Sequence, residues 1–316
     1  MAPSIHIHRL CIAATLLLLV PVLNAATPPT PVYILAGQSN MVGMGALEHL
    51  QDLVANDPRF AEFRGDNNST IRVYDNVTVY YNNHTGPCTA PGFGGSPHHF
   101  GVELGLASIL NAQSPTILLK TAWGGRSLAV DFRPPSAGVG NYSHIPPEHY
   151  GWEYRQMIHD VRFYLEQLTH HDGIAVRLAG LIWFQGWNDV ISPAFVDEYA
   201  SNLRHFLKDV RLDLGAPPDW PVVIAELGMH GLHPEGRAAA RILHFRTQQQ
   251  SVTLLPEFRN TTRFCRTAAY AVTNGTTYGG IYHYNGRADT YVWIGQAMGR
   301  ALQRLSANPR PSVTQH

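Results

Sequence analysis

Buried strand-like segments alternate along the chain with helical ones, and this alternation limits the fold more than any other feature. Four short segments are almost continuously apolar and rich in valine and isoleucine, namely residues 32–36, 116–119, 181–184 and 222–227. A fifth strand is expected over residues 268–273 or 280–283. Strands that are covered on both faces of a parallel sheet have this composition.

Between these strands, apolar residues recur at spacings of three and four, as on one face of a helix. The helical segments are residues 102–110, 152–168, 194–214 and 288–305. This order predicts an α/β fold with a doubly wound parallel sheet of about five strands and helices on both faces. Residues 58–100 and 124–150 lack a sustained period, so we expect long loops there. No internal repeat or linker divides the chain, which predicts one domain over residues 27–316.

Composition and charge exclude several classes of protein. A hydrophobic content of 45% is too high for an intrinsically disordered chain. Lys+Arg and Asp+Glu each number 23, and no basic run occurs, which argues against nucleic acid and anionic membranes as partners. The glycine motifs of dinucleotide and phosphate-loop sites are missing, as is HExxH. We therefore expect neither a cofactor nor a metal.

The N-terminus has the pattern of a secretory signal peptide. Arg9 precedes a 14-residue apolar run over residues 10–23, and the small residues Ala25 and Ala26 follow it. The run is short for a bilayer span, so an uncleaved anchor is the weaker alternative. We expect residues 1–26 to be removed, and the mature chain to be secreted or lumenal without membrane insertion.

Glycosylation sequons and cysteines agree with that compartment. Seven Asn-x-Ser/Thr sequons stand at Asn67, Asn68, Asn76, Asn83, Asn141, Asn260 and Asn274. Cys11 would leave with the signal peptide, and Cys88 and Cys265 would remain as an even pair. In an oxidising compartment these two are expected to form a disulfide, with two separate thiols as the alternative.

Chemically useful residues follow the expected strands. Ser39, in the run GQSNM, comes directly after the first strand, where ligands of open α/β sheets gather. Gly124 and Gly125 follow the second strand, Gln185 follows the third, and His283 stands near the C-terminus. Together they would supply a nucleophile, backbone and amide donors for an oxyanion, and a base. The plainer alternative for Ser39 is an N-cap of the next helix.

These motifs resemble a known family. GQSNM, the later WGG, WFQGWND and the C-terminal histidine resemble the sialate O-acetylesterase branch of the SGNH hydrolases, which is similar to the acetylxylan esterases of carbohydrate esterase family six. The resemblance runs over about residues 31–305. It implies a three-layer α/β/α flavodoxin-like fold and metal-free hydrolysis of O-acetyl esters on sugars.

The resemblance also implies roles for individual residues. Ser39 would be the nucleophile and His283 the general base. The oxyanion would be bound by the Ser39 N–H, by Gly124 or Gly125, and by the Gln185 side chain. Phe100-Gly101-Val102-Glu103-Leu104 is similar to the family's FGPEL motif.

Two positions depart from the family pattern. Gly280 stands three residues before His283, where many SGNH enzymes have an aspartate, and Trp187 stands where related esterases have the glutamate of QGExD. An orienting aspartate can be worth several orders of magnitude in rate. Asp189 is the first candidate to orient His283 and Asp289 the second, with a backbone carbonyl as a further alternative.

The expected function is removal of O-acetyl groups from a carbohydrate, either sialic acid or a plant-type polysaccharide, by a secreted serine esterase. Side chains near the strand ends would bind this acetylated substrate: Gln38, Asn40, Trp123, Arg126, Trp187 and Glu226. The alternative is a weak or inactive carbohydrate-binding protein on the same scaffold, which the missing aspartate favours. A lipase or thioesterase would need an apolar acyl groove, which the polar loops do not indicate. The oligomeric state stays open.

Overall fold

The computed structural model describes residues 28–66, 70–110 and 114–307. The expected signal peptide, residues 1–26, and the sequon residues Asn67 and Asn68 lie outside the described residues. Among the helices of the described residues, none combines the length and the apolar composition that crossing a bilayer requires.

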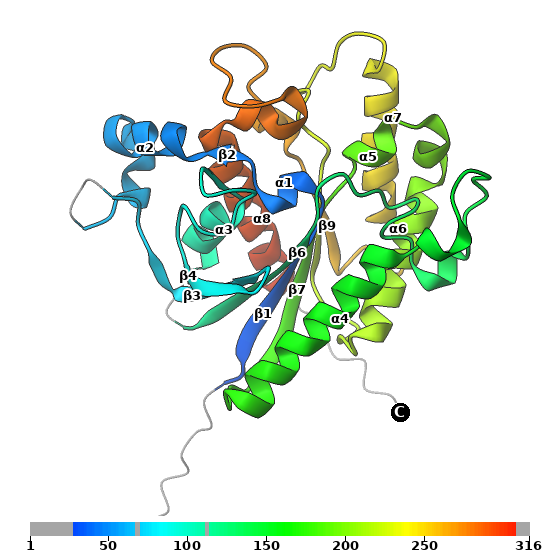
Figure 1. The fold of residues 1–316 in the computed structure, drawn as a ribbon, viewed down its shortest axis with the longest axis horizontal. Helices are drawn as coiled ribbons and strands as arrows, with labels where there is room; N and C mark the ends of the chain where they lie inside the picture. Colours follow the sequence, from blue (N-terminus) through cyan, green and yellow to red (C-terminus); the bar gives the residue numbers. More distant parts are fainter. Residues whose placement is uncertain (1–27, 67–69, 111–113, 308–316) are drawn as a thin grey trace, which may run out of the picture.

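Seven strands form one sheet in the order β4-β3-β6-β1-β7-β8-β9 (Figure 1). Their bounds are β1 Thr30–Gly37, β3 Tyr74–Tyr81, β4 His84–Cys88, β6 Thr116–Ala122, β7 Val176–Phe184, β8 Val222–Ala225 and β9 Thr262–Cys265. All neighbours pair in parallel except β3 and β4. β1 is central, with Ile34 beside Leu119 of β6 and Leu181 of β7. A separate two-stranded ladder joins β2 Gly45–Ala46 to β5 His99–Phe100.

Helices cover both faces of this sheet, as Figure 1 shows. α2 Leu47–Asn56, α3 Glu103–Leu110 and α8 Ala288–Ser306 lie on one side. α4 Trp152–Glu166 and α6 Pro193–Asp213 lie on the other, with α7 Ala239–Val252 against α6. Two single-turn helices begin at strand ends: α1 Ser39–Val42 and α5 Trp187–Val190. The expected three-layer α/β/α architecture is confirmed.

Several short turns complete the fold. The 3₁₀ segments are η1 Pro58–Phe63, η2 Pro135–Ala137, η3 Pro147–His149, η5 Ala268–Tyr270 and η6 Ile281–Gly286. A π-helical turn, η4 Gln167–His171, extends α4. Residues 124–150 contain only η2 and η3, in agreement with the long loop expected there.

The sheet has more strands than the five expected. The four apolar segments are strands, but the expected fifth strand is wrong because residues 268–273 and 280–283 contain 3₁₀ turns. The strand in that place is β9, an edge strand in which the exposed Arg263 and the partly exposed Phe264 break the apolar run. β3 and β4 arise inside residues 58–100, which we expected as loop. In β3 buried Val77 and Val79 alternate with less buried polar residues, the pattern of a sheet margin.

α3 and α8 pack closely because glycines meet at their crossing. A Cβ added to Gly105 would lie 2.0 Å from the Val292 carbonyl oxygen, and one added to Gly295 would lie 2.1 Å from that of Val102. No side chain fits at either position without separating the helices.

A buried ion pair connects α3 to the strand ends. Lys120 Nζ lies 2.9 Å from Glu103 Oε2, and both side chains are 0% exposed. The ammonium also donates to the carbonyls of Val42 at the end of α1 and of Phe93. Lys120 thereby uses its three donors inside the protein, and Glu103 of the FGVEL segment has a structural role.

The expected disulfide is wrong. Cys88 lies on β4 and Cys265 on β9, the two opposite margins of the sheet, and both are buried free thiols. Six strand spacings of about 4.8 Å separate them by about 29 Å, far beyond the Cα distance that a disulfide allows. The five described sequon asparagines are all exposed: Asn76, Asn83, Asn141, Asn260 and Asn274.

Candidate active site

Ser39 begins α1 immediately after the central strand. Gly37 ends β1 with φ +153°, and a Cβ there would lie 2.2 Å from the Phe184 carbonyl oxygen of β7, so the turn requires glycine. The N-cap of α1 is Gln38, whose side chain makes no capping bond, so Ser39 is not the N-cap. Ser39 is 7% exposed, and no described residue accepts a hydrogen bond from its N–H. Ser39 therefore places a hydroxyl and an N–H donor without a partner in the described residues at the end of β1.

The loop after β6 brings a second set of N–H groups to the same edge of the sheet. Trp123 N–H donates to the Gly37 carbonyl over 3.2 Å, which ties this loop to β1. Gly124 and Gly125 are exposed, and a Cβ at either one would meet no atom within 4 Å. Within the described residues neither N–H has a partner. Asn188 fixes the loop from β7 by donating to the Gly125 carbonyl.

The Gln185 side chain is not available as an oxyanion donor. Its Nε2 lies 2.5 Å from Asp189 Oδ2, 2.9 Å from the Arg126 carbonyl oxygen and 3.2 Å from Gln38 Oε1. Its Oε1 accepts from the Tyr199 hydroxyl over 3.0 Å. An amide nitrogen carries only two hydrogens, and these acceptors use both. The expected oxyanion role is therefore replaced by a structural one: Gln185 holds the β1, β6 and β7 loops together.

Asp189 supports that arrangement and does not orient His283. Besides Gln185, its carboxylate accepts from the backbone N–H groups of Leu128 and Ala129, each at 2.9 Å. Burial raises the pKa of Asp189 to about 7, against the effect of these hydrogen bonds. Asp289, the second candidate, binds Arg287 at 2.7 Å and the Thr290 N–H at 2.9 Å. Both carboxylates are thus engaged away from His283.

His283 lies in η6, a segment of strained backbone. The next two residues, Tyr284 and Asn285, have φ +51° and +55°. Such strain persists only where surrounding contacts impose it. The Tyr284 hydroxyl lies 2.8 Å from Thr267 Oγ1, and Asn285 Nδ2 donates to the Val272 carbonyl over 3.0 Å. These contacts hold the histidine backbone in place.

The His283 ring itself has no hydrogen-bond partner in residues 28–66, 70–110 and 114–307. Burial lowers its pKa, and the nearby His99 lowers it further. A neutral imidazole is the state that a general base needs. His99 was not among the residues expected near the site, because no motif of the sequence connects it with His283.

Asn40 joins the serine turn to the histidine turn. Its Nδ2 donates to the Tyr282 carbonyl over 3.1 Å, and its Oδ1 accepts from the Tyr291 hydroxyl over 2.7 Å. Asn40 follows Ser39 and Tyr282 precedes His283, so this bond ties together the two segments that carry Ser39 and His283.

Comparison with known proteins agrees with this geometry. Residues 29–304 match the family described as carbohydrate esterase, sialic acid-specific acetylesterase. The chain belongs to this family. It is therefore a carboxylic ester hydrolase of the carbohydrate O-acetylesterase class, as the resemblance implied. No curated protein sequence matches the esterase significantly.

Solved structures share the fold of this esterase at low sequence identity. A protein from Arabidopsis thaliana is 16% identical with a TM-score of 0.57, covering 88% of this chain and 99% of that one. NanS is 13% identical with a TM-score of 0.55, covering 89% and 99%. XAC1771, a carbohydrate acetylesterase from Xanthomonas citri, is 16% identical with a TM-score of 0.54, covering 88% of this chain and 57% of its own.

Three of the side chains expected to bind substrate belong to the interior of the esterase. Asn40 is bonded as described above. Gln38 Oε1 accepts from the N–H groups of Gly186 and Asn188 at 3.0 and 3.2 Å. Glu226 Oε2 accepts from the N–H groups of two residues of the neighbouring turn, Thr267 and Ala268. The expectation is corrected for Asn40 and Glu226, whose side-chain polar atoms have partners inside the protein. Gln38 is also buried, but its Nε2 has no hydrogen-bond partner among the described residues, so its expected contact with substrate stays a prediction.

The other three expected binders lie at the surface of the site. Trp123 and Trp187 are partly exposed, and Arg126 is exposed. Trp187 stacks between the rings of His230 and Tyr282, with centroids 5.7 and 6.0 Å away. The described residues contain no group of three His, Cys, Asp or Glu side chains placed to hold a metal ion.

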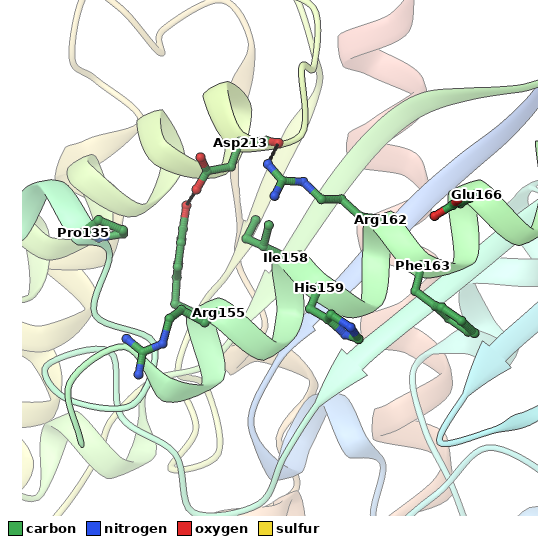
Figure 2. A pocket seen from close by; sticks show the side chains of 9 residues that line it. Pro135, Arg155, Ile158, His159, Arg162, Phe163, Glu166 and Asp213 are labelled. Atoms are coloured by element: carbon green, nitrogen blue, oxygen red, sulfur yellow. Dashed lines mark hydrogen bonds between the residues drawn. The ribbon is translucent and has the colours of Figure 1, made fainter. Parts of the chain in front are cut away.

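A hollow of about 460 Å³ on the outer side of α4 is not the catalytic site. Figure 2 shows that its side chains come largely from α4, among them Arg162 and Phe163, and that Arg162 reaches the Asp213 backbone carbonyl. Neither Ser39 nor His283 lines this hollow. It is a surface feature beside the active site and contains no nucleophile for ester hydrolysis.

Proposed function

We propose that this protein is a secreted serine esterase that removes O-acetyl groups from carbohydrates through an acetyl-enzyme. The observation that carries the proposal is the hydrogen bond from Asn40 to the Tyr282 carbonyl, which holds the segments of Ser39 and His283 against each other. Vacant N–H donors at Ser39, Gly124 and Gly125 support an oxyanion site at the same edge.

The mechanism begins with transfer of the Ser39 Oγ proton to the neutral His283 ring as the oxygen attacks the acetyl carbonyl carbon. The Ser39 N–H and the N–H of Gly124 or Gly125 bind the tetrahedral oxyanion. The C–O bond to the sugar then breaks, and His283 returns the proton to the sugar oxygen. Water, activated by His283, hydrolyses the acetyl-enzyme to acetate and free serine.

Ser39 and His283 act here as a dyad. Both aspartates considered as a third member are bound elsewhere, and the strained, anchored η6 turn fixes the backbone of His283 instead. Correct backbone placement keeps the base within reach of the nucleophile, but it supplies neither the tautomer control nor the imidazolium stabilisation that an orienting carboxylate gives.

Secretion is supported by the apolar run at residues 10–23 and by the exposure of the five described sequon asparagines. Expression in a eukaryotic host should yield protein in the medium that begins near residue 27 and shrinks on treatment with a glycosidase. Intracellular, unprocessed protein would contradict this part of the proposal.

The test of the catalytic part is acetate release from p-nitrophenyl acetate, acetylated xylan and O-acetylated sialosides. Ser39→Ala and His283→Ala should each lower kcat by at least about 10³-fold while thermal unfolding is unchanged. Undiminished turnover in Ser39→Ala would contradict the proposal. A folded wild type that binds the glycans without releasing acetate would instead identify a carbohydrate-binding protein on this scaffold.

A further inference from the structure

A second hollow, of about 550 Å³, lies between the 124–150 loop and the first turn of α4. Its polar and aromatic lining consists of Arg126, Asp131, Glu148, His149, Trp152 and Glu153. Arg126 is two residues from Gly124, and two residues of extended chain span at most about 7 Å. The backbone of Arg126 therefore lies close to the proposed oxyanion donors. We propose that it is a subsite for a neutral sugar residue that adjoins the acetylated residue in a longer glycan; this inference rests on the proposed esterase function.

Trp152 gives the hollow a surface suited to a sugar ring. Its side chain is 61% exposed, although a large aromatic ring is normally covered by protein. One face of a pyranose consists of C–H groups, which pack on an aromatic ring, while its hydroxyls remain free to donate at the rim. Glu148 lines the same hollow, and no described side chain donates to its carboxylate. An apolar face and a free acceptor therefore lie together.

The charges of the lining favour a neutral ligand. Three carboxylates line the hollow, and the single guanidinium, Arg126, is already paired at 2.9 Å with Glu153 and at 3.2 Å with Asp131. An anionic sugar would meet the unpaired Glu148 and no unpaired guanidinium or ammonium among the lining residues. The further basic side chain of the lining is His149.

A further cation of this region, Arg155, belongs to another feature. Arg155 donates to the backbone carbonyls of Tyr150 and Glu148 and lines the hollow on the outer side of α4, as Figure 2 shows. It does not line the subsite. The subsite therefore selects a neutral glycan, such as a pentose or hexose chain, over one that carries a carboxylate next to the acetylated residue.

Trp152→Ala tests the subsite, and Phe163→Ala is the matched control. Both rings are exposed on α4. Phe163, drawn in Figure 2, lines the hollow on the outer side of α4 and not the subsite. Trp152→Ala should lower kcat/KM for acetylated xylotriose by about fivefold to tenfold through KM and leave p-nitrophenyl acetate hydrolysis unchanged. Phe163→Ala should change neither. Equal loss on both substrates, or no loss on the trisaccharide, would overturn the inference.

A binding measurement separates failure of this inference from failure of the esterase function. Calorimetry at pH 7.5 with Ser39→Ala and unacetylated xylotriose needs no turnover. We expect binding that is at least about fivefold tighter than for a uronic-acid analogue of equal length, and that Trp152→Ala abolishes. Equal or tighter binding of the uronic-acid analogue would overturn the inference even if the enzyme releases acetate. Binding that depends on Trp152 without any acetate release would refute the esterase and keep the subsite.

A second inference rests on separate contacts around His283. The Tyr282 ring meets the His283 ring edge-on, with centroids 4.5 Å apart at 71°. Trp187 stacks on the Tyr282 ring at 25°, with centroids 6.0 Å apart. A Cβ at Gly280 would lie 2.6 Å from the Tyr282 ring, so a side chain at position 280 would require this ring to move. We infer that Tyr282 and Trp187 position the His283 ring by packing, in place of a hydrogen-bonded carboxylate.

Removing the ring should leave His283 mobile and more hydrated. Tyr282→Ala should lower kcat on p-nitrophenyl acetate by about tenfold or more with KM unchanged, and should shift the acid limb of the pH profile upward, because burial lowers the pKa of His283. Trp187→Ala should act in the same direction more weakly. Tyr282→Phe should retain activity, since only the ring is needed.

Ile281→Ala is the control, because this exposed side chain precedes Tyr282 in the same turn. It should leave kcat and the pH profile unchanged. An unshifted pH profile in Tyr282→Ala, or a Phe variant as impaired as the Ala variant, would overturn this second inference.

Discussion

Asn40 donates a hydrogen bond to the Tyr282 carbonyl over 3.1 Å and thereby joins two turns that lie 242 residues apart in the sequence. One turn presents Ser39 at the end of the central strand, and the other presents His283 before α8. The relative placement of Ser39 and His283 therefore depends on the buried side chain of Asn40.

Asn40→Asp tests this dependence. The aspartate keeps an acceptor for the Tyr291 hydroxyl but removes the donor to the Tyr282 carbonyl. We expect kcat/KM on p-nitrophenyl acetate to fall by about 10²-fold, because a displacement of about 1 Å in a catalytic group has that effect. Tyr291→Phe, which spares the bond to Tyr282, should lose less than about fivefold. Equal losses in the two variants would contradict the explanation.

A second prediction concerns the pair Gln185 and Asp189. Asp189→Asn would place an amide nitrogen among N–H donors from Leu128, Ala129 and Gln185, and these would then lose an acceptor. We expect kcat to fall by about 10²-fold as the loop of Gly124 shifts, and the melting temperature to fall with it. The kcat measures the first effect, and a thermal melt measures the second.

Asp289→Asn is the comparison, since this carboxylate pairs with Arg287 and not with Gln185. Its rate should change less than about threefold. A large loss in Asp289→Asn beside a small one in Asp189→Asn would restore Asp289 as the partner of His283.

The sequence was sufficient to predict the central strands and the place of Ser39 at the end of one of them. The β1 and β7 segments are apolar because both faces of these strands are covered. GQSNM follows the carboxyl end of β1, which is where open α/β sheets bind their ligands. The outer strands β3 and β9 escaped prediction because sheet-margin strands mix buried and exposed residues.

The hydrogen bonds and ring contacts that support the site could not be predicted in the same way. The Gln185 side-chain nitrogen has no free hydrogen because three acceptors surround it. Gln38, Arg126 and Asp189 contribute these acceptors from three separate loops. Likewise, Gly280 indicates a missing side chain, but only the folded turn shows that the Tyr282 ring fills the space. Such relationships arise from packing between distant segments, which residue spacing does not record.

A third prediction concerns the buried pair Lys120 and Glu103. Lys120→Met leaves Glu103 as an uncompensated charge in a fully buried position. Breaking one partner of such a pair costs about 3–5 kcal/mol of unfolding free energy. The double variant Lys120→Met/Glu103→Gln should recover part of this loss, since it removes the buried charge as well. Chemical denaturation of both variants measures the difference, and a double variant less stable than the single one would contradict the argument.

A fourth prediction concerns the crossing of α3 and α8. In Gly295→Ala the new Cβ would lie 2.1 Å from the Val102 carbonyl oxygen, so the helices must separate. We expect the unfolding free energy to fall by about 1–3 kcal/mol. Gly124→Ala is the control for stability, because its Cβ would meet no atom within 4 Å. Equal melting temperatures for the two variants would show that the crossing relaxes without cost.

A fifth prediction follows from the pKa of His283. Burial is the larger cause that lowers this pKa and the nearby His99 is the second, so the ring stays neutral as the pH falls through 6.5, the ordinary value for histidine. A general base is active when neutral, so kcat/KM should fall only below pH 6.5. His99→Gln removes the second cause, and the midpoint of the acid limb should move upward toward 6.5. If the midpoint of the acid limb lies near pH 7 and does not change in His99→Gln, the limb reports the titration of Asp189, because burial raises the pKa of Asp189 to about 7.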